Sequence, residues 1–310
     1  MSVMEIIAPI LFTAATGFAL AKFGVLEASV FDGLRRFLML VAIPLLLLMN
    51  IAEMTSISPG QARFGLLYGV LCFVVAGMTL GGTWMVAGSS RIRLATMWLA
   101  GSVPNTIIIG MPVTVQALGS EALPYFVVAL IVENLVMLPV SLVFLEIAGG
   151  SKSHWAMLLL KGLGRAIRSP LIASVVVGAV IAMVGFTLPS TAVDTMELLS
   201  AGVTGIALFF AGGLLARRSE ERRDDSRLVV VAVATRLCLA PALAYGLVLF
   251  VGGLGTTAAF TLILFAAAPC FSIFPVLVAP YGTSSLAARI QAYGTFFAIF
   301  TMSFWIGLLL

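Results

Sequence analysis

Charged residues are scarce in this chain of 310 residues, and their scarcity decides its class. Only 10% of the residues are Asp, Glu, Lys or Arg, whereas 61% are hydrophobic, and the mean hydropathy is +1.17. A water-soluble fold of this length needs more charge to cover its surface. We therefore expect an all-α integral membrane protein, and we expect no nucleic-acid partner despite the net charge of +4.

Histidine and cysteine are almost missing, which excludes several kinds of chemistry. The single histidine is His154, and the three cysteines, Cys72, Cys238 and Cys270, lie in separate apolar stretches. The chain has no metal-ligand spacing and no disulfide framework. It also lacks a paired nucleophile and base and a glycine-rich phosphate loop with its lysine. We expect no metal, no cofactor and no enzymatic activity.

Long apolar runs are what the chain has in abundance. A helix that crosses a bilayer needs about 20 predominantly apolar residues. Ten runs of roughly this length follow one another along the chain. They are 5–22, 36–53, 64–87, 94–118, 121–148, 169–186, 195–216, 228–250, 254–280 and 285–309.

The basic residues are distributed unequally between the loops that join these runs. Of the 17 Lys and Arg residues, all but Arg63 and Arg236 lie in alternate loops, after runs one, three, five, seven and nine. The loops with most positive charge stay in the cytoplasm. The pattern predicts a multi-pass protein of the cell membrane, inner or plasma, with both termini outside. The cytoplasmic basic residues are Lys22, Arg35, Arg36, Arg91, Arg93, Lys152, Lys161, Arg165, Arg168, Arg217, Arg218, Arg222, Arg223, Arg227 and Arg289.

One pattern of proline and glycine occurs twice, at a nearly constant offset. Pro9, Gly17 and Gly24 have the spacing P-x7-G-x6-G, and the same spacing recurs 161 residues later. The later copy consists of Pro170, Gly178 and Gly185. Five spans per copy is an odd number, so the second copy must be inverted in the membrane. We predict a first repeat at 1–148, a cytoplasmic linker at 149–168 and an inverted second repeat at 169–310, an organisation typical of secondary transporters.

The fourth and ninth runs carry two prolines each near mid-span. Pro104 and Pro112 interrupt the fourth run, and Pro269 and Pro275 interrupt the ninth. Proline removes a backbone donor and clashes with the preceding turn, so we expect broken helices that meet near the midplane. Half-helix N-termini there favour an anion. Asn105, directly after Pro104, either binds substrate or caps the half-helix, and the two roles are compatible. Smaller polar groups in these zones are Ser102, Thr106 and Ser272.

Two charged residues lie well inside predicted spans. Glu133, with Asn134 beside it, lies near the middle of the fifth run, and Arg236 lies in the eighth. Intramembrane ionisable residues are expensive and are functional candidates by default. Glu133 either carries a coupling proton or serves as a structural acid. Arg236 either holds an anionic substrate, pairs with an acid or extends toward the cytoplasmic surface.

Taken together, these motifs resemble the auxin efflux carrier family, which includes plant PIN carriers and bacterial carboxylate permeases. Pro104-Asn105-Thr106 followed by Gly110 and Pro112 is similar to the motif of its fourth segment. Pro269 with Tyr281-Gly282 is similar to its ninth segment. Pro44 is similar to its second-segment proline, and Arg236 with Pro241 to its eighth segment. The resemblance covers nearly the whole chain.

The resemblance implies ten transmembrane helices in two inverted repeats, with helices four and nine crossed. It implies an elevator-like movement of a core (helices 3–5 and 8–10) against a scaffold (helices 1, 2, 6 and 7), and a homodimer. The family's crossover residues carry over to Asn105, Pro104 and Pro269. Cys270 departs from the polar residue that is common in plant members, so auxin itself is not implied as the substrate.

We therefore expect a secondary transporter that exports small organic anions, either mono- or dicarboxylates. The substrate-binding candidates are Pro104, Asn105, Thr106, Arg236, Pro269, Cys270 and Ser272, and the coupling candidates are Glu133 and Asn134. The alternative is a sodium-coupled uptake carrier of the bile-acid symporter type. That alternative needs a cluster of oxygen ligands at the crossover, and the ninth run supplies only Ser272.

Overall fold

The structure is a computed structural model that describes residues 3–52, 58–87, 90–151, 154–216 and 225–309. Within these ranges every regular element is a helix, and the single pairing of β type is an isolated bridge. The basic residues predicted for cytoplasmic loops lie partly outside the described residues. Those outside are Lys152, Arg217, Arg218, Arg222 and Arg223.

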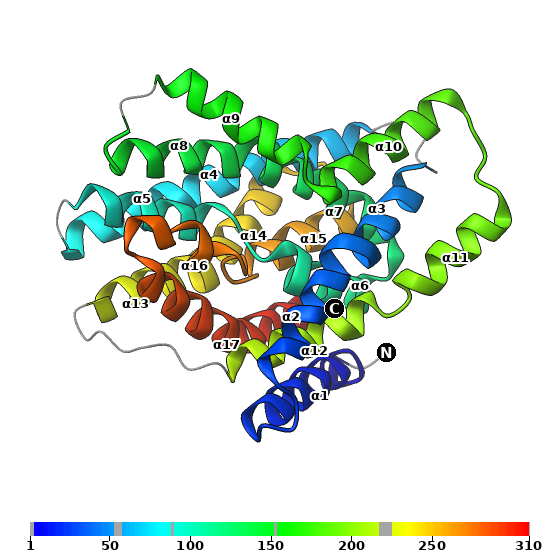
Figure 1. Cartoon of the computed structure of the whole chain (residues 1–310), viewed down its shortest axis with the longest axis horizontal. Helices are drawn as coiled ribbons and strands as arrows, with labels where there is room; N and C mark the ends of the chain where they lie inside the picture. The colour runs from blue at the N-terminus through cyan, green and yellow to red at the C-terminus, as the bar shows by residue number, and fades with distance from the viewer. Residues whose placement is uncertain (1–2, 53–57, 88–89, 152–153, 217–224, 310) are drawn as a thin grey trace.

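Helices follow one another from end to end of the chain (Figure 1). Up to residue 148 they are α1 Val3–Lys22, α2 Ala28–Phe37, η1 Leu38–Ala42, α3 Ile43–Ala52, α4 Pro59–Ala87, α5 Arg91–Ser102, η2 Thr106–Gly110, α6 Met111–Leu118, η3 Ser120–Ala122, α7 Leu123–Val132, η4 Glu133–Met137 and α8 Leu138–Ala148. After them come α9 Trp155–Ile167, α10 Pro170–Val184, α11 Ser190–Ser200, α12 Val203–Leu215, α13 Ser226–Ala234, η6 Thr235–Leu239, α14 Ala240–Val251, α15 Thr256–Ala266, α16 Phe274–Leu277, η7 Ala279–Tyr281 and α17 Ser284–Leu309.

Six helices of the described part are long and apolar enough to cross a membrane. They are Ala28–Ala52, Pro59–Val86, Ser120–Ala148, Ser190–Leu215, Ser226–Val251 and Ser284–Leu309. Shorter apolar helices occupy the other four predicted runs, at Ala8–Lys22, Thr106–Leu118, Pro170–Val184 and Thr256–Ala266. The prediction of an all-helical membrane protein is confirmed, whereas the number of ten spans stays a prediction.

Four segments of π-helix interrupt the long helices, and each ends two residues before a proline. The pairs are Leu38–Ala42 with Pro44, Thr106–Gly110 with Pro112, Glu133–Met137 with Pro139, and Thr235–Leu239 with Pro241. Proline cannot donate to the carbonyl four residues before it and clashes with that carbonyl. A π turn, with bonds that reach five residues back, relieves both problems. The prolines therefore put Thr106, Glu133 and Arg236 into irregular turns.

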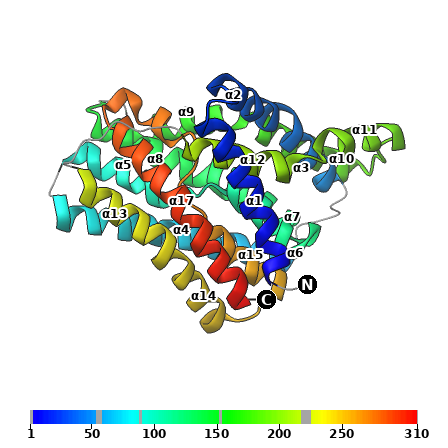
Figure 2. The ribbon, with the colours of Figure 1, turned by 90° about the horizontal axis from the view of Figure 1, so that it is seen from below.

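The helices pack in two groups. In one group α1 packs along α12 and α3 packs along α10. In the other, α4 contacts α5, α7 and α13, and α17 contacts α13, α15 and α16. Figure 1 shows α3, α10 and α11 together on one side and α4, α5 and α8 on the other. The start of α1 and the end of α17 lie near each other in both views (Figures 1 and 2).

Glycine permits the closest helix contacts in the first group. A Cβ on Gly17 of α1 would lie 2.0 Å from the carbonyl oxygen of Phe209 in α12. A Cβ on Gly178 of α10 would lie 2.9 Å from the carbonyl oxygen of Leu48 in α3. Real side chains do not approach backbone so closely, so only glycine permits either approach.

Contacts between segment ends divide into two sets. One set joins ends near the basic loops: Arg93 Nη2 to Asp225 Oδ1 at 3.3 Å, Thr96 Oγ1 to Thr283 Oγ1 at 2.9 Å, and Arg289 Nη2 to Ser226 Oγ at 3.0 Å. The other set joins ends near the remaining loops: Arg63 Nη2 to the Val251 carbonyl at 3.0 Å and Thr257 Oγ1 to Glu121 Oε2 at 3.4 Å. None of these five contacts joins a basic loop to one of the others.

Candidate functional site

The two broken helices meet backbone to backbone at their breaks. Pro104, between α5 and η2, pairs with Cys270, between α15 and α16, as an antiparallel β-bridge. The N–H of Asn105 donates to the carbonyl of Pro269 at 2.6 Å, and the N–H of Phe271 donates to the carbonyl of Val103 at 3.3 Å. Backbone groups freed by the two breaks thus satisfy each other inside the protein, as a membrane interior requires.

Asn105 connects the two breaks through its side chain and begins the second half-helix. Its Oδ1 accepts from the N–H of Ile108 at 3.3 Å, so it caps η2, and its Nδ2 donates to Oγ of Ser272 at 2.9 Å. The residue is buried. The capping role considered from the sequence is present, because the amide has the acceptor that an N-cap needs.

Glu133 is the centre of a buried cluster of three side chains. Its Oε1 accepts hydrogen bonds from the hydroxyls of Tyr68 in α4 and Thr106 in η2. The two hydroxyl oxygens are 3.2 Å apart. All three residues are buried. The cluster joins three helices, and Thr106 ties the carboxyl to the first turn of the half-helix that Asn105 caps.

A cavity of about 310 Å³ lies beside the crossing of the two broken helices. Its polar lining residues include Asn105, Glu133, Asn134 and Ser272, and Pro104 also lines it. The Nδ2 of Asn134 donates to the carbonyl of Leu130 at 2.9 Å, which fixes its amide along the helix. Apolar lining residues are Met39, Val103, Ile107, Ile108, Leu138, Leu142, Leu171, Phe271, Ile273 and Leu277, and Gly162 and Ser169 complete the wall. An apolar pocket with a few convergent polar groups is typical of small-molecule sites.

Arg236 contacts the half-helices that precede the two breaks, α5 and α15, near their C-terminal ends. Its Nε donates to the carbonyl of Ala268 at 3.0 Å, its Nη1 to that of Gly101 at 3.2 Å and its Nη2 to that of Phe265 at 3.4 Å. These carbonyls belong to the C-terminal ends of α5 and α15, where a cation is favoured. Arg236 is buried and is not among the residues that line the cavity. Its guanidinium therefore holds the two helix ends together.

The predicted residues therefore separate into two sets. Pro104, Asn105, Glu133, Asn134 and Ser272 line one cavity. Thr106, Arg236, Pro269 and Cys270 surround the crossing without lining that cavity.

Tyr68 is the residue that the sequence analysis missed. It is buried in α4, and its hydroxyl donates to Glu133. The available signal was its position in the middle of an apolar run, because a buried tyrosine hydroxyl needs a partner. The sequence could not show that this partner is Glu133, because the contact depends on how α4 packs against the helix that contains Glu133.

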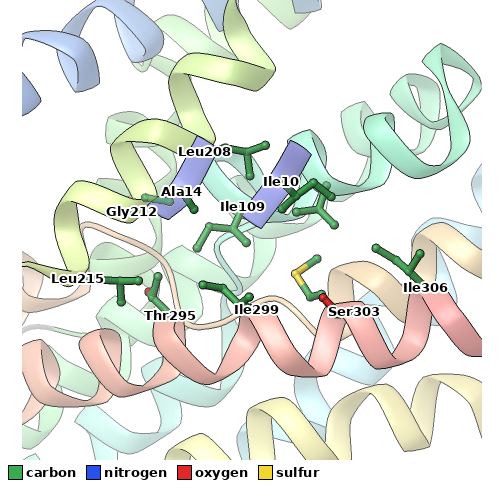
Figure 3. Close-up of a pocket in the computed structure, with 13 residues that line it drawn as sticks. Ile10, Ala14, Ile109, Leu208, Gly212, Leu215, Thr295, Ile299, Ser303 and Ile306 are labelled. Atoms are coloured by element: carbon green, nitrogen blue, oxygen red, sulfur yellow. The ribbon is translucent and has the colours of Figure 1, made fainter. Parts of the chain in front are cut away.

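A second, smaller cavity lies between the two packing groups (Figure 3). It has a volume of about 30 Å³ and lies between Ile10 and Ala14 of α1, Leu208 and Gly212 of α12, and Ile299 of α17. The described lining is apolar except for the hydroxyls of Thr295 and Ser303, and no charged residue belongs to it. Its volume is too small for an organic anion, so it is a seam in the packing.

Among the described residues, no group of three or more His, Cys, Asp or Glu side chains could hold a metal ion. Cys72 and Cys270 are buried, Cys238 is exposed, and all three are free thiols.

Comparison of the sequence with known proteins identifies its family. The sequence matches the family described as membrane transport protein over residues 2–306, which is nearly the whole chain. No curated protein matches the chain. Helices of membrane-spanning length agree with that match, and so does the resemblance to auxin efflux carriers noted from the motifs around Asn105. The chain belongs to the membrane transport protein family, the family of the auxin efflux carriers.

Proposed function

We propose that the protein is a secondary transporter that exports small organic anions, mono- or dicarboxylates, through the cavity at Asn105. The observation that carries the proposal is the position of Asn105, whose amide caps a half-helix, contacts the second break at Ser272 and lines the cavity. The N-terminal end of a half-helix carries partial positive charge, and amide and hydroxyl hydrogens complement a carboxylate. A volume of about 310 Å³ suits a small carboxylate.

We propose that residues 1–148 and 169–310 form inverted repeats joined by the linker 149–168, with ten spans in all. The glycine contacts support this, because Gly17 packs on Phe209 and Gly178 packs on Leu48. Residues 17 and 178 differ by 161 positions, and so do residues 48 and 209. A two-fold relation between the halves predicts such reciprocal contacts, whereas a chance resemblance of two glycines does not.

We propose that both termini lie outside the cell membrane and that the basic loops lie in the cytoplasm. The two sets of contacts between segment ends support this grouping of the loops, since each set joins loops that the charge pattern puts on one side. The excess of basic residues then assigns the cytoplasmic side. Gly162 and Ser169, which close part of the cavity, belong to or adjoin the linker. The cavity therefore faces the cytoplasm in this conformation, as an exporter requires for loading.

We propose an elevator movement of the core against the scaffold, in a homodimer. The cavity lies between the two packing groups, because Met39 and Leu171 come from η1 and α10 while Asn105 and Ser272 come from the crossing. The apolar seam in Figure 3 separates the same two groups. When the core slides against the scaffold along an apolar seam, no hydrogen bonds across the seam are broken. The energy barrier to such a movement is therefore low.

We propose that Glu133 couples transport to protons. Its carboxyl lines the cavity and is bonded through Thr106 to the half-helix that faces the substrate. Gain or loss of a proton on Glu133 changes what Tyr68 and Thr106 can donate to, and that change reaches Asn105 through η2. Protonatable carboxyls at membrane depth serve as proton relays in transporters.

Counterflow in proteoliposomes tests the proposed function. The purified protein is reconstituted, and acetate, pyruvate, malonate and succinate are offered with and without sodium and pH gradients. Asn105→Ala should abolish exchange of the transported anion. Asn50→Ala is the matched control, because the Asn50 amide also bonds to backbone, donating to the Leu46 carbonyl at 2.8 Å, and it is not among the lining residues. Exchange by Asn105→Ala at the wild-type rate, or a strict requirement for sodium, would contradict the proposal.

A further inference from the structure

A third cavity, of about 400 Å³, lies against the opposite face of α16. Ile273 and Leu277, four residues apart, face the cavity at Asn105, whereas Pro275 and Val276 face the third cavity. Residues four apart share one face of a helix, so α16 separates the two spaces. Ser272, just before α16, lines both.

The third cavity differs from the first in having a basic side chain in its described wall. Asp32 and Arg35 of α2 line it, together with Gln291 and Thr295 of α17 and Ser272. Arg35 is partly buried, whereas the adjacent Arg36 is exposed and is not a lining residue. Among the described residues of this lining, Arg35 is the single cation and Asp32 is the single acid.

Ser272 connects the two cavities chemically. Its oxygen accepts the hydrogen bond from Nδ2 of Asn105 at 2.9 Å. A hydroxyl has a single hydrogen to donate, so Ser272 can donate to an anion in only one of the two cavities at a time. An anion that moves from the third cavity to the first can therefore accept a hydrogen bond from the same Ser272 hydroxyl in both places.

We propose that the third cavity is a cytoplasmic anion site, where Arg35 receives the carboxylate before it moves to Asn105. The inference rests on the proposed function and adds a first binding step to it. The guanidinium matches a carboxylate with two parallel donors, and the Gln291 amide and Ser272 hydroxyl supply further donors in the same wall. A cation at the mouth of a cleft raises the rate of anion capture, and salt screens that effect.

Three variants, each of which removes one charge, test the site, because they should weaken, strengthen or leave unchanged the affinity for the anion. Affinity is measured by calorimetry on the purified full-length chain, with the tightest binder among acetate, pyruvate, malonate and succinate. Arg35→Gln should weaken binding about tenfold and reduce its salt dependence, the scale expected for loss of one charged partner. Asp32→Asn should strengthen binding because it removes the opposing charge. Arg36→Gln changes the net charge equally but should leave affinity within about twofold of wild type.

Further variants separate charge from damage to the fold. Arg35→Lys should retain most of the affinity, and Gln291→Leu should weaken binding with no change in net charge. Equal affinity of Arg35→Gln and Arg36→Gln, in a wild type that still exchanges the anion, would overturn the inference and leave the proposed function standing. If no carboxylate of the panel binds to or is exchanged by the wild type, the proposed function fails and the inference fails with it.

Discussion

Asn105 donates a hydrogen bond of 2.9 Å from its Nδ2 to the hydroxyl of Ser272, 167 residues away in the chain. The bond joins the breaks of two helices at the wall of one cavity. Either break alone would leave polar groups exposed to the interior of the protein. Together they form a polar site whose geometry depends on both helices. A substitution at one break should therefore shift the side chains at the other.

The two roles of Asn105 can be separated by substitution. Asn105→Ser keeps a side-chain oxygen for capping η2 but is too short to reach Ser272, so we expect near-normal stability and weakened carboxylate binding. Asn105→Ala also loses the cap, which costs about 1 kcal/mol, and should lower the unfolding temperature as well. Thermal unfolding in detergent and calorimetric affinity measure the two effects. A variant Asn105→Ser with unchanged affinity would reduce Asn105 to a cap.

Glu133→Gln should uncouple transport from the pH gradient. Glutamine retains an oxygen that accepts from Tyr68 and Thr106, so the cluster should persist, but it cannot exchange a proton. We expect anion exchange to continue while a pH gradient no longer drives accumulation in proteoliposomes. Glu146→Gln, farther along the same span in α8, is the control and should remain proton-driven. Full proton-driven accumulation by Glu133→Gln would make Glu133 a structural acid.

Arg236 should behave as a positioning residue. Arg236→Ala removes the guanidinium donor from the carbonyls of Gly101 and Ala268. The carbonyl of Phe265 loses one of two donors, because it also accepts from the N–H of Ala268 at 3.2 Å. A buried group that loses its partner costs about 1–3 kcal/mol, so we expect a large fall in unfolding temperature. Arg236→Lys keeps the charge but not the planar fork and should fall between alanine and wild type.

The direct contact with substrate predicted for Arg236 from the sequence would give a different result. In that case Arg236→Lys would bind the carboxylate weakly while unfolding at the wild-type temperature. Calorimetry and thermal unfolding on the same preparation distinguish the two outcomes.

The reciprocal glycine contacts should be equally intolerant of a methyl group. Gly17→Ala and Gly178→Ala each push a Cβ into a backbone carbonyl, and overpacking of this kind costs about 1–3 kcal/mol. Gly81→Ala makes the same change in α4, where nothing lies within 4 Å of the added Cβ, and should be neutral. Unfolding temperatures in one detergent check all three. A neutral Gly17→Ala with a damaging Gly178→Ala would argue against the two-fold relation.

The sequence predicts the helices well because their causes are local. Runs of apolar residues set the spans, and Pro104 and Pro269 explain the breaks at their own positions. Pro112 and Pro275 do not break their helices. Pro112 lies inside the continuous helix Thr106–Leu118, where the π segment before it accommodates the ring. Pro275 lies in the first turn of α16, where proline is tolerated. The π segments also follow from local causes, since each precedes a proline.

The site is less predictable because its contacts join distant segments. Asn105 and Glu133 stand out in the sequence as polar residues in apolar runs, but nothing local reveals that Tyr68 donates to Glu133. Likewise, one arginine in a span suggests an anion, and only the packed structure shows that Arg236 faces three carbonyls. Arg35 is one of many basic residues outside the apolar runs, and only the cavity that it shares with Ser272 and Gln291 singles it out.

Substrate protection of a cysteine in the cavity tests the central claim most directly. The three native cysteines are replaced by alanine, and single cysteines are placed at Leu142, which lines the cavity, and at Leu160, which is exposed on α9. A thiol reagent is applied from the cytoplasmic side with and without the carboxylate that the wild type exchanges. We predict that the saturating carboxylate slows labelling at position 142 several-fold and leaves position 160 unchanged. Equal labelling rates at position 142 with and without substrate would contradict a site between Asn105 and Ser272.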